Sequence, residues 1–325
     1  NNAISKARIA ELVFDILSLK NSGYSIVIVS SGAISAGAGA LKTNRENISI
    51  PKKQALASIG QTILMNTWRE AFLKAGCEVG QILLTEDDVK DRKRFINARH
   101  TFHALLEMGI IPIVNENDSV VIKEIKFGDN DILSAHVTNI VEADLLILLS
   151  DVDGFYNNLF DPEPIEEIHQ ITKDLIAKAG GSGSIHGTGG MLSKIKAAEV
   201  IIKCGEKMII ANGRASGILS KIIKGEKIGT IFIGNEPLSS RKRWIAFNMK
   251  SSGKIEIDDG AVKALQQHKK SLLSTGVIDI EGKFHLGDAV EIINKSGDII
   301  GKGIVNYNFN ELQIIKGKKT SQIKD

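Results

Sequence analysis

The sequence of 325 residues has little cysteine and no long apolar segment, and both absences restrict what the protein can be. Its two cysteines, Cys77 and Cys204, lie far apart and belong to no Cys-x-x-Cys or His/Cys ligand spacing. We therefore expect two reduced thiols, with no disulfide framework and no zinc site. The chain contains no apolar run of roughly 18 residues and no visible signal peptide, so we expect a cytoplasmic protein rather than a membrane or exported one.

Aromatic residues and excess charge are also scarce. Phe, Trp and Tyr make up 5% of the chain, and the formal net charge is +3. Residues 236–325 hold 15 Lys and Arg against 11 Asp and Glu, so only this tail is basic. Nucleic-acid-binding surfaces usually have a denser basic stripe and aromatic residues for stacking. Here the tail's aromatic residues are scattered, so the sequence supports RNA as a partner only weakly; they are Trp244, Phe284, Tyr307 and Phe309.

The sequence lacks the P-loop pattern, but it contains another glycine-rich turn, at residues 187–191, that leads into a helical pattern. Glycines allow backbone N–H groups to close around an anion, and the N-terminus of a helix adds a partial positive charge. Lys194 lies in the first turn of this helical pattern. We interpret the segment as a phosphate-binding turn; a plain connection between two elements is the alternative.

Apolar strand-like runs alternate with helical patterns through residues 1–234, which predicts an open, mostly parallel sheet with helices on both faces. The predicted strands are residues 26–29, 78–84, 111–115, 145–149 and 208–211; the predicted helices are residues 3–19, 51–75, 95–108, 132–142 and the segment after Met191. No strand precedes the first helix in the printed sequence, so we expect that a first strand is missing from it.

The tail, residues 253–325, has short β-like runs separated by Asp-Gly, Glu-Gly and Ser-Gly turn signals, which predicts a small β barrel. These runs are residues 254–257, 276–280, 289–293, 299–305 and 311–315. We therefore predict a first domain at 1–235, a linker at 236–252 and a second domain at 253–325. A chain that ends near Asn235 is expected to keep the chemistry.

Polar clusters follow four of the predicted strands, at the edge where open α/β sheets bind ligands. The clusters are residues 30–37, which we predict as a small-residue loop, 115–118 with 127–131 nearby, 150–156, and 211–213. Each has a structural alternative: a turn at 128–131, a helix cap at Asp151, and a cap at Asn117 or Asp118. Their coincidence at successive strand ends favours a binding site.

Two other groups predict structure rather than chemistry. His100 and His103 share one helix face but lack a third ligand, so we predict no metal site there. Gln54, Ala55, Ser58, Gly60 and Gln61 indicate a closely packed helix.

Taken together, several strings resemble the glutamate 5-kinases of the amino acid kinase family, and the tail resembles their PUA domain. The strings are residues 30–37, 114–120, 127–131, 150–154 and 187–191, and in the tail 240–246, 258–265, 276–277 and 301–307. This resemblance covers nearly the whole chain. It implies the α/β amino acid kinase fold, a three-layer sandwich, followed by a small mostly-β PUA barrel.

The resemblance also implies the activity, which is ATP-dependent phosphorylation of the γ-carboxylate of L-glutamate, the first step toward proline. Lys194 and Asp151 would be catalytic, with Asp151 orienting the lysine, and Ser31, Asp118 and Asn130 would contact glutamate. Mg²⁺ would bridge the phosphates of ATP. The nucleotide would contact Ser150, Asp151, Thr188, Gly189, Gly190, Met191, Leu192, Ser193 and Lys194. A homo-oligomer, dimer or tetramer, and feedback inhibition by proline are further implications.

The sequence departs from the family's pattern at two places. The Lys-x-Gly-Ser motif of the family's first strand is absent from the printed sequence, and the stretch after Tyr156 is shorter than the family's. Two alternatives stay open. One is a kinase of the same family that acts on another carboxylate or on a carbamate, and the other is an RNA-binding protein with a degenerate kinase fold.

Overall fold

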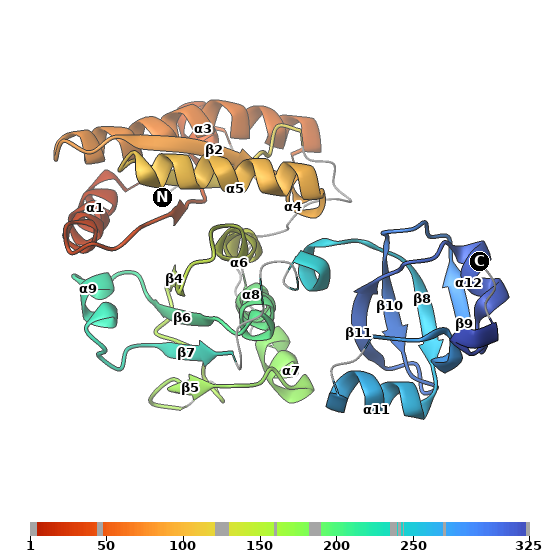
Figure 1. Ribbon diagram of the computed structural model, residues 1–325. Coiled ribbons are helices and arrows are strands. Elements are labelled where there is room, and N and C mark those ends of the chain that lie inside the picture. The colour runs from red at the N-terminus through yellow and green to blue at the C-terminus, as the bar shows by residue number, and fades with distance from the viewer. Residues whose placement is uncertain are drawn as a thin grey trace. The chain divides into compact units, whose positions relative to one another are not determined.

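The chain forms two compact units, Asn1–Leu238 (unit 1) and Ser239–Asp325 (unit 2), each with its own helices and strands (Figure 1). The computed structural model describes residues 5–43, 48–120, 130–158, 161–181, 190–234, 239, 242, 244–268 and 271–322. The finer predicted division, with a linker at 236–252, stays a prediction.

The strands of unit 1 pair in two sets. The first set is wholly parallel, in the order β1 (Ile28–Val29), β3 (Ile111–Glu116), β2 (Val79–Leu84). The second set has the order β4 (Leu145–Ser150), β6 (Lys207–Asn212), β7 (Thr230–Ile233), β5 (Glu167–Ile168). In the second set only the β6–β7 pair is antiparallel.

Helices cover both faces of these strands. They are α1 (Lys6–Asn21), α2 (Ala33–Ala40), α3 (Ile50–Leu73), α4 (Glu86–Lys90), α5 (Arg92–Glu107), α6 (Asn130–Val141), α7 (Lys173–Gly181), α8 (Met191–Cys204) and α9 (Ile218–Ile223).

The side chains of β6 show how the layers are built. Ile209 and Ala211 lie in a core shared with α1, α3 and α9, whereas Met208 and Ile210 lie in a second core shared with α6, α7 and α8. Successive residues of a strand point to opposite faces of its sheet. β6 is therefore buried between two layers of helices, which confirms the predicted α/β class.

Helix α2 corrects one sequence-based expectation, because residues 30–37 were predicted as a small-residue loop and the chain is helical from Ala33. Packing against α3 explains the difference. A Cβ atom added to Gly60 would lie 1.7 Å from the Ala33 carbonyl oxygen, and one added to Gly37 would lie 2.0 Å from the Leu56 carbonyl oxygen. The two helices thus touch backbone to backbone, which bears out the closely packed helix predicted around Gly60.

Unit 2 contains one four-stranded sheet with an apolar core of its own, in which Ile255, Ile257 and Phe284 are buried. The strands have the order β11 (Ile299–Ile304), β10 (Ala289–Ile293), β8 (Ser251–Ile257), β9 (Val277–Gly282), and only β8 and β10 are parallel neighbours. The helical segments are η1 (Trp244–Asn248), α11 (Asp259–His268), η2 (Ser274–Gly276), α12 (Phe309–Ile315) and η3 (Thr320–Gln322).

The strand predicted at 311–315 is wrong, because these residues belong to α12. Asn308 and Glu311 form a capping box: the Glu311 backbone N–H donates to Asn308 Oδ1 at 3.0 Å, and the Asn308 backbone N–H donates to Glu311 Oε2 at 2.8 Å. These bonds satisfy two N–H groups that a helix start leaves unpaired. Across the described ranges of both units, no helix combines the length and the apolar character needed to cross a membrane.

Candidate active site

The first turn of α8 places Ser193 and Lys194 beside the first turn of α6, and the two helices are neighbours in Figure 1. Lys194 Nζ donates to Asp131 Oδ2 at 2.8 Å, and Ser193 Oγ lies 2.8 Å from the same oxygen. The side chains of Lys194 and Asp131 are only 10% and 17% exposed, so water screens this ion pair weakly. The pair uses one of the three N–H bonds of the ammonium group, which leaves it further donors for an anion.

The start of α8 itself suits an anion. The helix begins after Gly190, which has no side chain to cap it, and a helix N-terminus carries a partial positive charge. Gly190, Met191, Leu192 and Ser193, which are predicted nucleotide contacts, form this end of the helix. Thr188 and Gly189 lie outside the described residues, so their predicted role stays a prediction.

The structure gives Lys194 a carboxylate partner other than the predicted one. Asp151 was expected to orient the lysine, but its exposed side chain accepts a hydrogen bond from Ser150 Oγ at 3.2 Å. The carboxylate beside Lys194 is Asp131, to which the sequence analysis assigned no role of its own. The two residues are 63 positions apart in the chain, so no local pattern identifies them as partners.

The ends of β4 and β6 form a polar edge next to Asp151. Asn212 Nδ2 donates to Asp153 Oδ1 at 2.8 Å, and the Gly213 backbone N–H donates to the Ser150 carbonyl oxygen at 2.7 Å.

Tyr156 lies near the same strand end. Its burial, and secondly the neighbouring Asp153, raise the pKa of its phenol group, which stays protonated at neutral pH. Among the residues whose positions are described, no three His, Cys, Asp or Glu side chains form a group that could hold a metal ion.

A cavity of about 290 Å³ lies where β2 and β3 end against α3, and Asp118 is part of its wall. Glu116 and Gln61 line it as well. Two carboxylates in one small cavity favour a ligand that carries a cationic group. Asp118 thus lies in a cavity of ligand size, whereas Ser31, which is exposed ahead of α2, does not line it.

Asn130, the first residue of α6, connects the surroundings of Lys194 with this cavity. Its Nδ2 donates to the Ser30 carbonyl oxygen at 2.9 Å and to Asn115 Oδ1 at 3.0 Å. Asn115 Nδ2 in turn donates to Gln61 Oε1 at 2.7 Å, and Gln61 lines the cavity. Asn115 and Gln61 are 54 positions apart, so no local sequence pattern identifies their side chains as partners.

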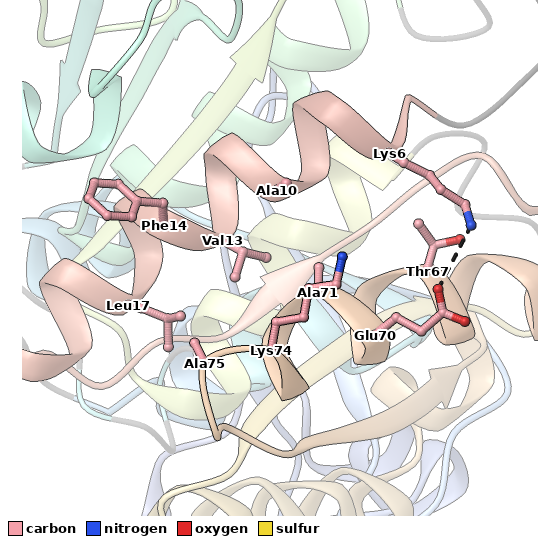
Figure 2. Close-up of a pocket in the computed structure, with 10 residues that line it drawn as sticks. All are labelled: Lys6, Ala10, Val13, Phe14, Leu17, Thr67, Glu70, Ala71, Lys74 and Ala75. Atoms are coloured by element: carbon pink, nitrogen blue, oxygen red, sulfur yellow. Dashed lines mark ion pairs between the residues drawn. The ribbon is translucent and has the colours of Figure 1, made fainter.

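A second hollow, of about 280 Å³, lies between α1 and α3 and contains none of the predicted site residues (Figure 2). Lys6 Nζ and Glu70 Oε2 form an ion pair of 3.8 Å on one side of it, and the ring of Phe14, which is 80% exposed, lies at the far end. Both ends of this ion pair are well exposed, and such pairs contribute little to stability. This hollow has none of the paired acids and amides of the first cavity.

The aromatic residues of unit 2 serve mainly as core. Trp244 and Phe284 are buried, and the Phe309 ring packs edge-on against Phe284 with ring centroids 5.5 Å apart. Stacking on bases requires exposed ring faces. Of the four aromatic residues singled out in the sequence, Tyr307 is the one with a large exposed fraction, 43%.

Comparison with known proteins identifies the family of this chain. Residues 2–212 match the model of the amino acid kinase family, and residues 253–325 match the PUA domain. The chain therefore belongs to the amino acid kinase family.

Curated relatives match along nearly the whole chain. It is 45% identical to the glutamate 5-kinase of Caldanaerobacter subterraneus subsp. tengcongensis, over 100% of this chain and 88% of that protein. It is 47% identical to the glutamate 5-kinase of Syntrophotalea carbinolica, over 97% of this chain and 86% of that protein. The glutamate 5-kinase of Geobacter sulfurreducens is 45% identical, over 100% of this chain and 88% of its own length. The resemblance expected from the sequence motifs is confirmed.

Proposed function

We propose that this protein transfers the γ-phosphoryl group of ATP to the γ-carboxylate of L-glutamate, forming glutamyl 5-phosphate, the first step toward proline. Relatives that are 45–47% identical over almost the whole chain and are named glutamate 5-kinase support the proposal. The structural observation that carries it is the Lys194–Asp131 ion pair at the start of α8, directly beside Asn130. It puts a fixed cation next to a predicted substrate contact.

Transfer of a phosphoryl group between two anions requires that they are held in line and that their charge is neutralised. Lys194 and the N-terminus of α8 would face the oxygens of the transferred group, and Asp131 holds the Lys194 ammonium in place. A γ-carboxylate oxygen attacks the γ-phosphorus, the bond to the bridging oxygen breaks, and ADP leaves. Because a glutamate carboxyl group has a pKa of about 4.3, it is already ionised at neutral pH and needs no general base.

Mg²⁺ bound to the phosphates of ATP would neutralise part of their charge. Asp151 and Asp153, which follow β4, carry oxygen ligands of the kind that Mg²⁺ prefers. We therefore keep Ser150 and Asp151 on the nucleotide side, and we assign to Asp131 the role of orienting the lysine.

Other parts of the proposal rest on the family resemblance: inhibition by proline, assembly into a dimer or tetramer, and a cytoplasmic location. Titration of the activity with proline tests the first, and light scattering tests the second.

The activity is tested with full-length protein, ATP, Mg²⁺ and a panel of acceptors in the presence of hydroxylamine. An acyl phosphate reacts with hydroxylamine to form a coloured hydroxamate on addition of Fe³⁺. Glutamate should give the hydroxamate, whereas aspartate, N-acetylglutamate, carbamate and UMP should not. Hydroxamate formed preferentially from another carboxylate would favour the alternative kinase.

Asp118→Asn and Asn130→Ala are expected to act mainly on glutamate binding, since both residues are assigned to the substrate side. The glutamate KM should rise about tenfold or more, the effect of about 1.4 kcal/mol of lost binding, while the KM for ATP changes little. Initial rates at varied glutamate and ATP measure both constants. Asp87→Asn, an exposed carboxylate on α4, is the control. Equal changes in the two KM values would contradict the assignment.

Removing the tail is expected to leave catalysis intact, because every residue assigned to chemistry lies in unit 1, which has its own apolar cores. A chain that ends at Asn235 should retain kcat/KM for glutamate within about tenfold, which corresponds to about 1.4 kcal/mol of barrier. Circular dichroism and thermal unfolding establish that the shortened protein is folded. A folded but inactive protein would show that unit 2 contributes to the site.

A further inference from the structure

The side chains of Gln61, Asn115 and Asn130, which we call the amide chain, are joined by hydrogen bonds whose directions are set by two backbone groups. The Glu116 backbone N–H can only donate, and it lies 2.9 Å from Asn115 Oδ1, so the atom at that position is the oxygen. The Ser30 carbonyl can only accept, and it lies 2.9 Å from Asn130 Nδ2, so that atom is the nitrogen.

These two anchors determine the rest of the amide chain. With its oxygen facing Glu116, Asn115 directs its Nδ2 at Gln61, and the atom that accepts this hydrogen bond at 2.7 Å is Gln61 Oε1. Asn130 Nδ2 donates both of its N–H groups, one to the Ser30 carbonyl oxygen and one to Asn115 Oδ1. Within the described residues, the polar side-chain atom of Asn130 that is left for a ligand is Oδ1, which can only accept.

The orientation of the Gln61 side chain lowers the stability of the folded protein, because it leaves a buried amide nitrogen unpaired among the described residues. Its Nε2 is buried and donates to no group in the part of the chain that the structure describes. An unpaired buried donor costs about 1–3 kcal/mol, which an apolar side chain of the same length would avoid. Gln61 is also held in place, because the neighbouring Gly60 is in backbone contact with α2. In exchange, Gln61 Oε1 gives Asn115 Nδ2 a hydrogen-bond partner, so the Asn115 side chain is held at its nitrogen as well as at its oxygen.

An acceptor at Asn130 restricts which part of an amino acid it can bind. At neutral pH both carboxylates of glutamate only accept hydrogen bonds, and its ammonium group is the one donor. We propose that Gln61 is a positioning residue: it holds the nitrogen end of the Asn115 side chain in place, and Asn115 in turn holds Asn130 with its side-chain Oδ1 toward the substrate ammonium group. This inference rests on the proposed function and deepens it: the site selects an amino acid over a dicarboxylate that lacks the amine.

Gln61→Met tests the inference, because it keeps the length of the side chain and removes the acceptor for Asn115. The glutamate KM should rise about tenfold, as expected for one lost hydrogen bond to a charged group, with kcat and the KM for ATP nearly unchanged. Gln61→Glu keeps an oxygen for Asn115 Nδ2 and should restore most of the affinity. Gln266→Met makes the same change at an exposed position of α11, away from the cavity; it is the control and should leave the glutamate KM unchanged.

Two further measurements separate a positioning role from a general loss of structure. Glutarate has both carboxylates but no amine, so its inhibition constant as a competitor of glutamate should be the same in Gln61→Met and in wild type. The side-chain amide NMR signals of Asn115 and Asn130 should shift in Gln61→Met and return in Gln61→Glu. If Gln61→Met does not fold, Asn115→Asp, which replaces the donor toward Gln61 with a carboxylate oxygen, should also raise the glutamate KM.

These results test the inference about Gln61 separately from the proposed function. An unchanged glutamate KM in Gln61→Met, an equal rise in Gln266→Met, or an equal weakening of glutarate binding overturns the inference. Wild-type protein that forms no hydroxamate from glutamate overturns the proposed function instead. In that case the NMR signals still report whether Gln61 orients Asn115 and Asn130.

Discussion

Replacing Lys194 with alanine in the full-length protein is expected to lower kcat about 100-fold while the protein stays folded. Lys194 is the cation at the start of α8, and removing one group that stabilises developing charge commonly raises the barrier by about 3 kcal/mol. Because the ammonium group is fixed by Asp131 rather than by solvent, little reorganisation accompanies the reaction. Steady-state kinetics at saturating glutamate and ATP measures the effect.

Lys196→Ala is the matched control, since Lys196 lies two residues further along the same helix and is exposed. Its kcat should equal that of wild type. Asp131→Asn should also lower kcat, and the double variant should be scarcely worse than Lys194→Ala, because the two side chains act as one unit. Additive losses would show that Asp131 acts independently of Lys194, and a wild-type kcat in Lys194→Ala would remove the lysine from the mechanism.

Gly60→Ala is expected to cause the largest loss of stability of any single methyl addition proposed for this chain. The added Cβ would lie 1.7 Å from the Ala33 carbonyl oxygen and 2.4 Å from the Gly37 nitrogen, and neither backbone atom can rotate away. Helices α2 and α3 must then separate, so we expect the free energy of unfolding of unit 1 to fall by about 3 kcal/mol. Urea unfolding followed by circular dichroism measures this change.

Gly301→Ala serves as the comparison, because a Cβ atom there meets no atom within 4 Å and its backbone conformation suits other residues. Its stability should stay close to that of wild type. A Gly60→Ala variant with an unchanged unfolding midpoint would mean that α2 and α3 are not in backbone contact. Since Gln61 follows Gly60, a rise in the glutamate KM should accompany the loss of stability.

Much of unit 1 could be predicted because its strands and helices have long, distinct periodicities. The apolar run at 145–149 and the helix after Met191 lie where the pattern placed them, with bounds Leu145–Ser150 and Met191–Cys204.

Two short or glycine-rich segments were predicted with the wrong secondary structure. Residues 311–315 fit a strand or one face of a helix equally well, and the capping box at Asn308 decides between them. Two glycines, Gly37 and Gly39, lower the local helix propensity of α2, and the contact with α3 outweighs this loss.

The candidate site was predictable only in part, for a related reason. Lys194, Asn130 and Asp118 lie next to turn or strand-end patterns that can be read locally. The partnerships of Lys194 with Asp131 and of Asn115 with Gln61 join residues that are far apart in the chain. A side chain's partner is set by the packing of whole elements, so Asp131 and Gln61 gained their roles only once α6, α8 and α3 were placed.

Strand β6 contributes alternate side chains to both apolar cores of unit 1, and this sharing makes the two cores energetically dependent on each other. Neither core can unfold without exposing one face of β6. The two halves of unit 1, meaning the helices packed on each face of β6, should therefore unfold in a single cooperative step. Lys194 belongs to a helix over one core, and Gln61 belongs to a helix over the other. A ligand that binds at either end of the site therefore stabilises both halves of the unit against unfolding.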